Sequence, residues 1–212
     1  MRRLLILGAG GCGREVLQWA NDINEKEKRW DEFAFLDFDE TVLNGKKCEA
    51  KIIANDDTYV VRDCDEFVCA VGDGLLRKKI IEKMEKKGAK LTTLIHPSAE
   101  VTDSAVLGLG SILYPYCVVT ADTVIGKGCI INMHTSIAHD VVIGNYCTVS
   151  PNCHITGMCT LKENVFLGVG VNVIPNIEIG ANAYVCAGST VMTRVKGDTK
   201  VIGNPAKRIK GW

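Results

Sequence analysis

His139 and Asp140 are adjacent within the stretch INMHTSIAHDVVIGNYC. Imidazole titrates near neutral pH, so a histidine can accept the proton of an attacking nucleophile. A carboxylate beside one ring nitrogen fixes the tautomer and stabilises the imidazolium that forms. The pair therefore predicts a general base and its orienting acid. The other histidines have no acidic neighbour in the sequence, and we expect structural roles for His96, His134 and His154.

A second set of residues could bind phosphate. Gly8, Gly10 and Gly13 form a G-x-G-x-x-G pattern that follows an apolar run and precedes a helical pattern. Backbone N–H groups at such a turn can hold phosphate oxygens, and Asp37, at the end of the next apolar run, could bind a ribose hydroxyl. A redox dinucleotide needs two mononucleotide-binding halves, whereas about 94 residues supply only one. The loop predicts a nucleotide or nucleotide-sugar site, with a turn that merely packs strand on helix as the alternative.

Every sixth residue from Ile95 to Val191 is isoleucine, leucine or valine, without a break in register. This period is typical of a parallel β-helix with three short strands per turn. Aliphatic side chains then stack inward, and successive turns lie about 4.8 Å apart. Small or β-branched residues occupy the position four further on, including five of the ten cysteines, and no C-x-x-C occurs. We therefore interpret these cysteines as small apolar fillers and expect no disulfide or metal framework.

The residues before the coil show a different pattern. Their apolar runs alternate with two helical patterns and end at Leu7, Asp37 and Gly72. This alternation predicts a small parallel α/β sheet, with a further short strand near Ile52. We therefore predict two domains. Residues 1–94 form a Rossmann-like nucleotide-sugar-binding domain, and residues 95–212 form a β-helix domain with a C-terminal tail.

Lys+Arg and Asp+Glu number 25 each, so the chain has no net charge and no global basic field for nucleic acid or an anionic membrane. No apolar stretch reaches 18 residues, and glycines follow the N-terminal apolar run too soon for a signal peptide. We expect a cytoplasmic protein without a membrane span. Only ten charged residues lie between positions 95 and 196, which favours burial of an outer coil face in a closed cyclic oligomer.

Several motifs together resemble a known family. They are a glycine loop GAGGCG in a small α/β domain, LIHPSA, an unbroken hexapeptide coil, SIAHDVVIG and a terminal GNPAKRI. These look like the sialic acid O-acetyltransferase family, whose members include bacterial UDP-4-amino-sugar N-acetyltransferases. The resemblance covers essentially the whole chain. It implies a left-handed β-helix, a homotrimer, and acetyl-CoA bound in a cleft between neighbouring coils.

The resemblance also implies roles for individual residues. His139 is the general base, and Asp140 is its orienting acid, where many relatives have glutamate. Asn132 lies near the amino group of the sugar. Other substrate contacts fall on Gly10, Gly11, Cys12, Asp37, Phe38 and Gly72. Contacts to acetyl-CoA fall on Thr148, Gly157, Val169 and Ala187, with the Gly157 backbone at the acetyl oxygen. No metal is implied.

Two positions depart from the family pattern. Many relatives have histidine at the positions of Cys12 and Thr148. The first departure bears on the identity of the sugar nucleotide. The second predicts an altered contact near the thioester.

Together these features predict an acetyl-CoA-dependent N-acetyltransferase that acts on a nucleotide-linked amino sugar, in particular a UDP-4-amino sugar, in glycan biosynthesis. His139 takes the proton during direct attack on the thioester, because no coil cysteine neighbours it in the sequence as a nucleophile. The residues leave UDP, GDP and CMP open. Acetylation of a hydroxyl on sialic acid or another sugar is the alternative, since it would use the same base.

Two alternatives come from other classes. One is a nucleotide-binding scaffold without catalysis, in which the coil serves only to assemble the protein. The other is a zinc carbonic anhydrase, because His134 and His139 show the H-x4-H spacing of some coils of that class. A catalytic zinc needs a third protein ligand. Neither His96 nor His154 lies a whole number of 18-residue turns from the pair, which argues against that site.

Overall fold

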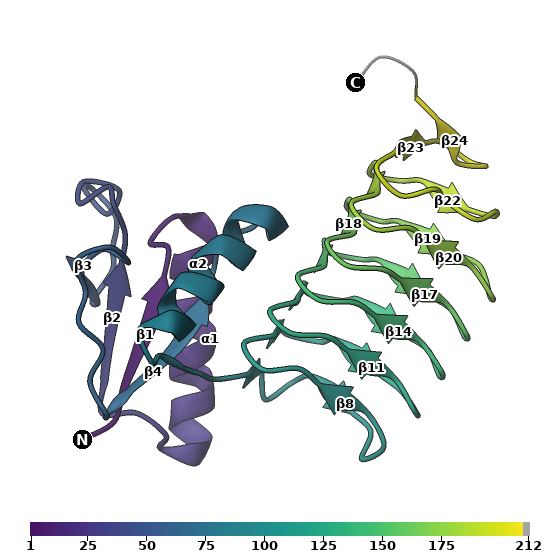
Figure 1. Ribbon diagram of the computed structural model, residues 1–212. Helices are drawn as coiled ribbons and strands as arrows, with labels where there is room; N and C mark the ends of the chain where they lie inside the picture. The colour runs from purple at the N-terminus through teal and green to yellow at the C-terminus, as the bar shows by residue number, and fades with distance from the viewer. Residues whose placement is uncertain (210–212) are drawn as a thin grey trace.

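A computed structural model describes residues 1–209, so the end of the predicted tail, residues 210–212, lies outside the described part. The chain forms an α/β unit followed by a three-sided coil (Figure 1). The α/β unit contains β1 (Arg3–Leu7), α1 (Gly11–Glu27), β2 (Glu32–Leu36), β3 (Lys51–Ala54), β4 (Asp65–Cys69), α2 (Gly74–Lys86) and β5 (Lys90–Leu91). Its strands are all parallel, in the order β3-β2-β1-β4-β5. The predicted parallel sheet is therefore found, and β3 is the short strand expected near Ile52.

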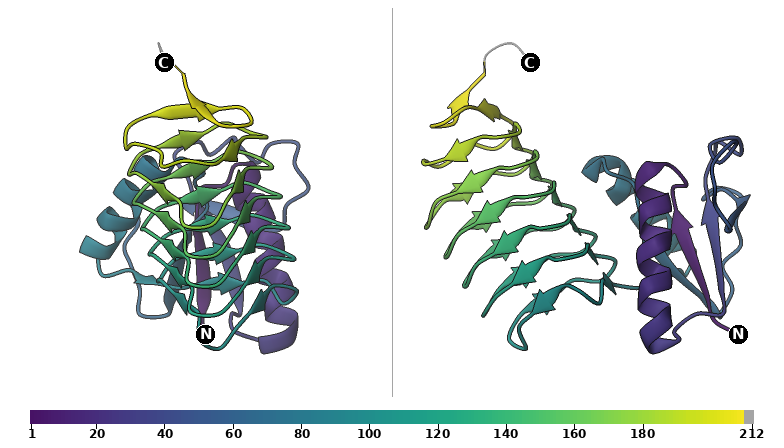
Figure 2. Two further views of the ribbon diagram at one scale, coloured as in Figure 1. Left: turned by 90° about the vertical axis from the view of Figure 1, so that its right-hand side faces the viewer. Right: turned by 180° about the vertical axis from the view of Figure 1, so that it is seen from behind.

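The two helices cover opposite faces of this sheet because its central strands are apolar on both sides. In β1, Leu4 and Ile6 pack with α1, whereas Leu5 and Leu7 pack with α2. Every residue of β1 is buried, as expected for an interior parallel strand. Helix α1 also packs against the first coil strand, so it lies between the sheet and the coil (Figure 2). No helix within residues 1–209 is long and apolar enough to cross a membrane.

Apart from β23 and β24 at its end, the coil consists of two-residue parallel strands that repeat along three sheets. The first sheet contains β7 (Glu100–Val101), β10 (Val118–Val119), β13 (Ser136–Ile137), β16 (His154–Ile155), β19 (Asn172–Val173) and β22 (Thr190–Val191). The second contains β8 (Val106–Leu107), β11 (Val124–Ile125), β14 (Val142–Ile143), β17 (Thr160–Leu161) and β20 (Glu178–Ile179). The third contains β6 (Leu94–Ile95), β9 (Ile112–Leu113), β12 (Ile130–Ile131), β15 (Thr148–Val149), β18 (Phe166–Leu167), β21 (Tyr184–Val185), β23 (Lys200–Ile202) and β24 (Lys207–Arg208).

The register confirms a β-helix with 18 residues per turn. Ile137 pairs with Val119 in the turn below and with Ile155 in the turn above. All three residues are buried in the coil, whereas Ile95 is 38% exposed because it lies in the first strand of the third sheet, at the open lower end. At the upper end Val195 bridges Ile179, so the last turn is shorter than the others. The antiparallel pair of β23 and β24 ends the described chain there.

Nearly every corner of the coil has one residue in left-handed backbone, so a regular 18-residue turn has three of them. Asp140 has a φ of 58°, and Asp122 and Met158, one turn below and above it, have φ values of 58° and 61°. Aspartate tolerates this conformation because its short polar side chain can hydrogen-bond locally. His139 therefore lies at a coil corner, where its ring projects away from the core.

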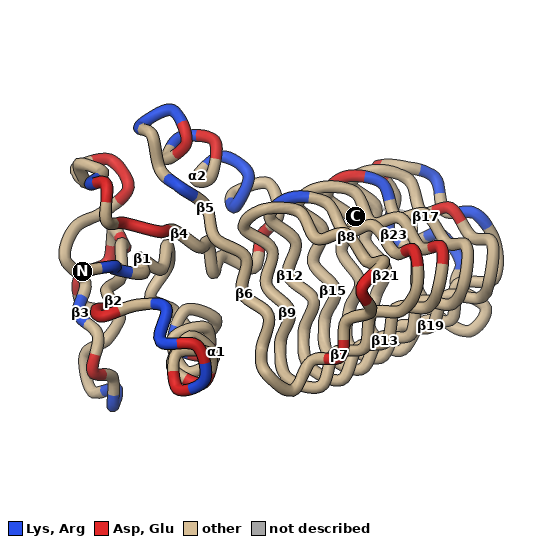
Figure 3. The backbone as a smooth tube through the Cα atoms, turned by 90° about the horizontal axis from the view of Figure 1, so that it is seen from below, with Lys and Arg blue, Asp and Glu red and all other residues tan. Residues whose placement is uncertain are grey.

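Charged residues are dense on the α/β unit and sparse on the coil, where Lys and Arg lie mainly along one edge and acidic residues also occur near β7 and β21 (Figure 3). The second coil sheet instead shows a column of exposed valines, Val106, Val124 and Val142, on successive turns. An exposed apolar column on a nearly uncharged face is a surface that another copy could cover. It supports the predicted oligomer, which stays a prediction.

Candidate active site

The predicted general base and its acid are in direct contact at one coil corner. His139 Nδ1 lies 2.7 Å from Asp140 Oδ2. A carboxylate is a hydrogen-bond acceptor when ionised, so Nδ1 carries the proton and Nε2 is the basic nitrogen. The two side chains are 57% and 56% exposed, which leaves Nε2 open to a reactant from outside the chain.

Gly157 forms the surface on which the His139 ring rests. It lies one coil turn above His139, and a Cβ atom on it would come within 2.7 Å of His139 Cε1 and 2.8 Å of Nε2. Glycine is therefore required for the ring to lie against the backbone at this corner. The predicted base, its acid and the predicted contact to the acetyl group thus meet in one place.

The glycine loop lies between β1 and α1 as predicted. A Cβ atom on Gly13 would collide with the carbonyl oxygen of Gly8, so the third glycine permits the close packing of helix on strand. Asp37 follows β2, and its carboxylate accepts hydrogen bonds from the N–H groups of Ala9 at 2.7 Å and Asp39 at 3.0 Å. Asp37 therefore also holds the glycine loop in position.

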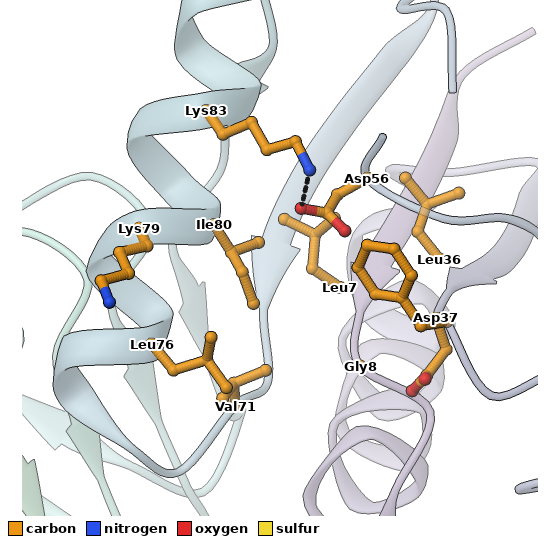
Figure 4. A pocket seen from close by; sticks show the side chains of 11 residues that line it. Leu7, Gly8, Leu36, Asp37, Asp56, Val71, Leu76, Lys79, Ile80 and Lys83 are labelled. Carbon is orange, nitrogen blue, oxygen red and sulfur yellow. Dashed lines mark hydrogen bonds and ion pairs between the residues drawn. The ribbon is translucent and has the colours of Figure 1, made fainter. Parts of the chain in front are cut away.

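A cavity of about 420 Å³ opens at the carboxyl ends of β1, β2 and β4 (Figure 4). Phe38 lines it and is 62% exposed, and Asp37 and Gly8 lie at its floor. The cavity is also lined by α2 residues that the sequence analysis did not single out: Leu76, Lys79, Ile80 and Lys83. Lys83 Nζ lies 2.7 Å from Asp56 Oδ2 and 5.6 Å from the centre of the Phe38 ring. The cavity therefore offers apolar walls that suit a base, and of its two ammonium groups that of Lys83 is paired with Asp56 and Asp57.

Cys12 connects the glycine loop to the coil. It lies in the first turn of α1, and its Sγ is 3.0 Å from the hydroxyl oxygen of Tyr114. Burial raises the pKa of the Cys12 thiol, so it is neutral near pH 7 and is not an activated nucleophile. Tyr114 is buried at the end of β9, and Asn132 follows β12 one turn above it. The glycine loop therefore contacts the coil one turn below Asn132.

The remaining predicted contacts to acetyl-CoA lie in two separate parts of the structure. Thr148 is 9% exposed and hydrogen-bonds to Gly72 O at 3.0 Å, between the α/β unit and the coil. Val169 and Ala187 are exposed on successive turns at the corner between the third and first sheets. A full face of the coil separates that corner from His139. A single chain therefore does not bring all the predicted acetyl-CoA contacts together.

Residues 1–209 contain no group of three His, Cys, Asp or Glu side chains that could hold a metal ion. His134 instead stacks on Tyr116, with ring centres 5.0 Å apart. His154 hydrogen-bonds to Ser136 at 2.8 Å. His96 has an acidic partner that is distant in the sequence, because its Nε2 lies 3.1 Å from Asp22 Oδ2.

Comparison with known families places both parts of the chain. Residues 3–84 match the PglD N-terminal domain, and residues 122–157 match the bacterial transferase hexapeptide of six repeats. A parallel α/β unit followed by a hexapeptide β-helix with an exposed histidine–aspartate pair defines a hexapeptide acetyltransferase.

Full-length relatives define the family more closely. The chain is 29% identical to GDP-perosamine N-acetyltransferase of Escherichia coli O157:H7, over 97% of this chain and 95% of that protein. PerB from Caulobacter crescentus, solved with CoA and GDP-perosamine, is 30% identical with a TM-score of 0.90, covering 99% of this chain and 98% of its own. The acetyltransferase domain of PglB from Neisseria gonorrhoeae, solved with acetyl coenzyme A, is 29% identical with a TM-score of 0.90, covering 98% and 99%. The chain belongs to the bacterial sugar N-acetyltransferase family and is an acetyl-CoA-dependent acetyltransferase, as its motifs predicted.

Proposed function

We propose that the chain transfers the acetyl group of acetyl-CoA to the amino group of a nucleotide-linked sugar. The observation that carries this proposal is the contact of 2.7 Å between His139 and Asp140, with the ring held against Gly157. The cavity beside the glycine loop supplies a place for the nucleotide. The substrates named for the relatives, GDP-perosamine above all, support an amino sugar as the acceptor.

The reaction is a direct transfer without an acyl-enzyme. The sugar nitrogen attacks the thioester carbonyl while His139 Nε2 accepts its proton. The N–H group of Gly157 donates to the oxyanion of the tetrahedral intermediate. As the intermediate collapses, the carbon–sulfur bond breaks and the CoA thiolate takes the proton from the imidazolium. Asp140 stabilises that imidazolium through Nδ1.

The proposed ligand contacts form two groups, one for the sugar nucleotide and one for acetyl-CoA. Gly10, Gly11 and Cys12 hold the diphosphate at the start of α1, and Asn132 lies near the amino group. The nucleoside lies against Asp37, Phe38 and Gly72, and Lys79 adds positive charge to the cavity lining. Acetyl-CoA contacts the backbone of Val169 and Ala187, whereas the Thr148 hydroxyl is occupied by hydrogen bonds within its own chain.

Assembly completes this site. His139 and Asn132 lie at opposite ends of one coil face, so the base of one chain is positioned to meet an amine bound to its neighbour. We propose a homotrimer with three such shared sites, a Rossmann-like nucleotide domain over 1–94, a left-handed coil domain with a C-terminal tail over 95–212, and a cytoplasmic location. Sedimentation that gives a monomer at working concentration, with full activity, would contradict the shared site.

The identity of the nucleotide carried by the sugar is a separate part of the proposal. The motif resemblance predicts UDP, whereas the relatives that act on GDP-perosamine make GDP the second candidate. Incubation with acetyl-CoA and a panel of UDP-, GDP- and CMP-linked amino sugars tests both, with mass spectrometry of the products. Addition of one acetyl group to one panel member identifies the nucleotide. Acetylation of sialic acid alone establishes O-acetylation instead, and nucleotide binding without any product favours the scaffold.

A further inference from the structure

Arg77 is completely buried where α2 meets the coil, and it has no carboxylate partner among the described residues. Its Nη1 donates to Val71 O at 2.6 Å and to Gly72 O at 3.1 Å, on the loop after β4. Its Nη2 donates to Tyr146 O at 2.8 Å and to Cys147 O at 3.1 Å, on the coil. Through Nε it also donates to the coil at Gly128 O, at 2.7 Å. One guanidinium thus joins three separate segments of backbone.

Thr148 completes this connection. Its Oγ1 accepts from Arg77 Nη2 at 2.9 Å and donates to Gly72 O at 3.0 Å. The hydroxyl is therefore occupied on both sides within the chain. The loop that it holds borders the nucleotide cavity, because Val71 lines that cavity.

The local sequence explains how Arg77 reaches this position. Asp73 caps α2 by accepting from Leu76 N at 2.8 Å, which sets the start of the helix. At Gly74 a Cβ atom would come within 2.5 Å of Tyr146 O, so the helix begins in close contact with the coil corner. Arg77 follows within the first turn and points into the contact.

A buried arginine without an acid is costly, because its charge loses hydration. Burial accordingly lowers the pKa of Arg77. Apolar side chains could join two surfaces at lower cost. The planar guanidinium group of Arg77 instead fixes both the direction and the distance of the carbonyl groups that it binds. The arrangement therefore defines geometry more than it adds stability.

We infer that Arg77 and Thr148 are positioning residues that hold the Val71–Gly72 loop of the nucleotide cavity at a fixed place on the coil. Acting through this loop, they set where the sugar nucleotide lies relative to the coil corners. The inference rests on the proposed nucleotide site. It gives Thr148 a role within its own chain, different from the predicted contact with acetyl-CoA.

The test compares Thr148→Val, Thr148→Ser and Arg77→Lys with wild type. Thr160→Val on β17 is the matched control, since Thr160 makes no side-chain hydrogen bond in the described chain. Calorimetric titration with UDP and GDP gives nucleotide affinity without turnover, and kinetics give the KM for acetyl-CoA. We expect Thr148→Val to weaken nucleotide binding about 10-fold, the effect of losing one buried hydrogen bond to a charged group. Arg77→Lys should weaken it at least as much, because an ammonium group has only three donors to replace the six hydrogen bonds of Arg77. Thr148→Ser, which keeps the hydroxyl, restores the affinity, and the KM for acetyl-CoA stays unchanged.

Each other outcome contradicts the inference in a distinct way. A lower melting temperature with unchanged nucleotide affinity makes Thr148 and Arg77 merely structural. A rise only in the KM for acetyl-CoA in Thr148→Val makes Thr148 a coenzyme contact. If wild type itself binds neither nucleotide, the proposed nucleotide site fails before any variant is compared. If wild type binds and the variants do not differ, only the positioning role fails.

Discussion

Substitution of Gly157 by alanine tests whether the position of the His139 ring controls the rate. A Cβ atom at Gly157 would come within 2.7 Å of His139 Cε1, whereas two carbons in contact prefer about 3.5 Å. The ring must therefore move by about 0.8 Å to admit the methyl group. The backbone at Gly157 is not in the left-handed region, so alanine is tolerated there apart from this collision.

The size of the effect follows from that displacement. A misplacement of about 1 Å in a catalytic group can lower the rate by about 100-fold. We expect Gly157→Ala to lower kcat by between about 10- and 100-fold. The N–H group proposed to bind the oxyanion is retained in this variant. The loss of kcat therefore reports the displacement of the His139 ring. The KM for acetyl-CoA should stay unchanged.

A double-mutant cycle provides the control. In the His139→Ala background the three closest contacts of the Cβ atom of Gly157→Ala, all with the His139 ring, are removed, so the second substitution should no longer lower the melting temperature. Steady-state kinetics measure kcat. Thermal unfolding of wild type, the two single variants and the double variant measures the loss of stability in each background. Full kcat in Gly157→Ala, or an equal loss of stability in both backgrounds, would refute the reasoning.

The remaining predictions concern the acid, a buried ion pair and metals. Asp140→Asn should lower kcat at least about 10-fold with an unchanged melting temperature, because asparagine also accepts left-handed backbone but cannot stabilise the imidazolium of His139; equal activity would contradict the role of the acid. Burial alone would raise the pKa of Asp65, but hydrogen bonds from Tyr59 and Arg3 outweigh it and lower that pKa below its usual range. The stabilisation is thus present above the unfolded value of about 3.9 and is lost as the pH falls through the lower, folded value. Asp65→Asn should cost about 3 kcal/mol of unfolding free energy at pH 7, and urea titrations should show this difference shrinking below about pH 4; a constant difference would contradict the ion pair. Dialysis against EDTA should leave the transfer rate unchanged, and a loss restored by zinc would revive the metal alternative.

The coil was predictable because its physical cause repeats. Each inward position from Val119 to Val191 meets the same surroundings, so an aliphatic residue recurs every sixth position and the register follows. The histidine–aspartate pair was predictable for a similar reason, because neighbours in the sequence remain neighbours at a corner. The shortened last turn was not predicted, since the bridge from Val195 to Ile179 depends on the fold and not on the period.

Contacts between distant segments could not be read from the sequence. The pairing of His96 with Asp22 joins the start of the coil to α1. Lys79 and Lys83 lie on a helix with many lysines, so their sequence context does not distinguish them. They line a cavity only because the sheet lies beside this helix. The burial of Arg77 could have been expected from the sequence, because it lies on the same face of α2 as Ile81 and Met84, which are buried. A charged residue on an apolar stripe indicates a buried polar contact, although its partners emerge only from the fold.

The central claim is that His139 removes the proton of the attacking amine. The most direct measurement compares kcat of wild type and His139→Asn with the acetylated amino sugar as the product, together with the affinity of each for CoA. The account predicts a fall in kcat of roughly 10²- to 10⁴-fold with unchanged CoA affinity. A variant that retains the wild-type kcat would contradict it.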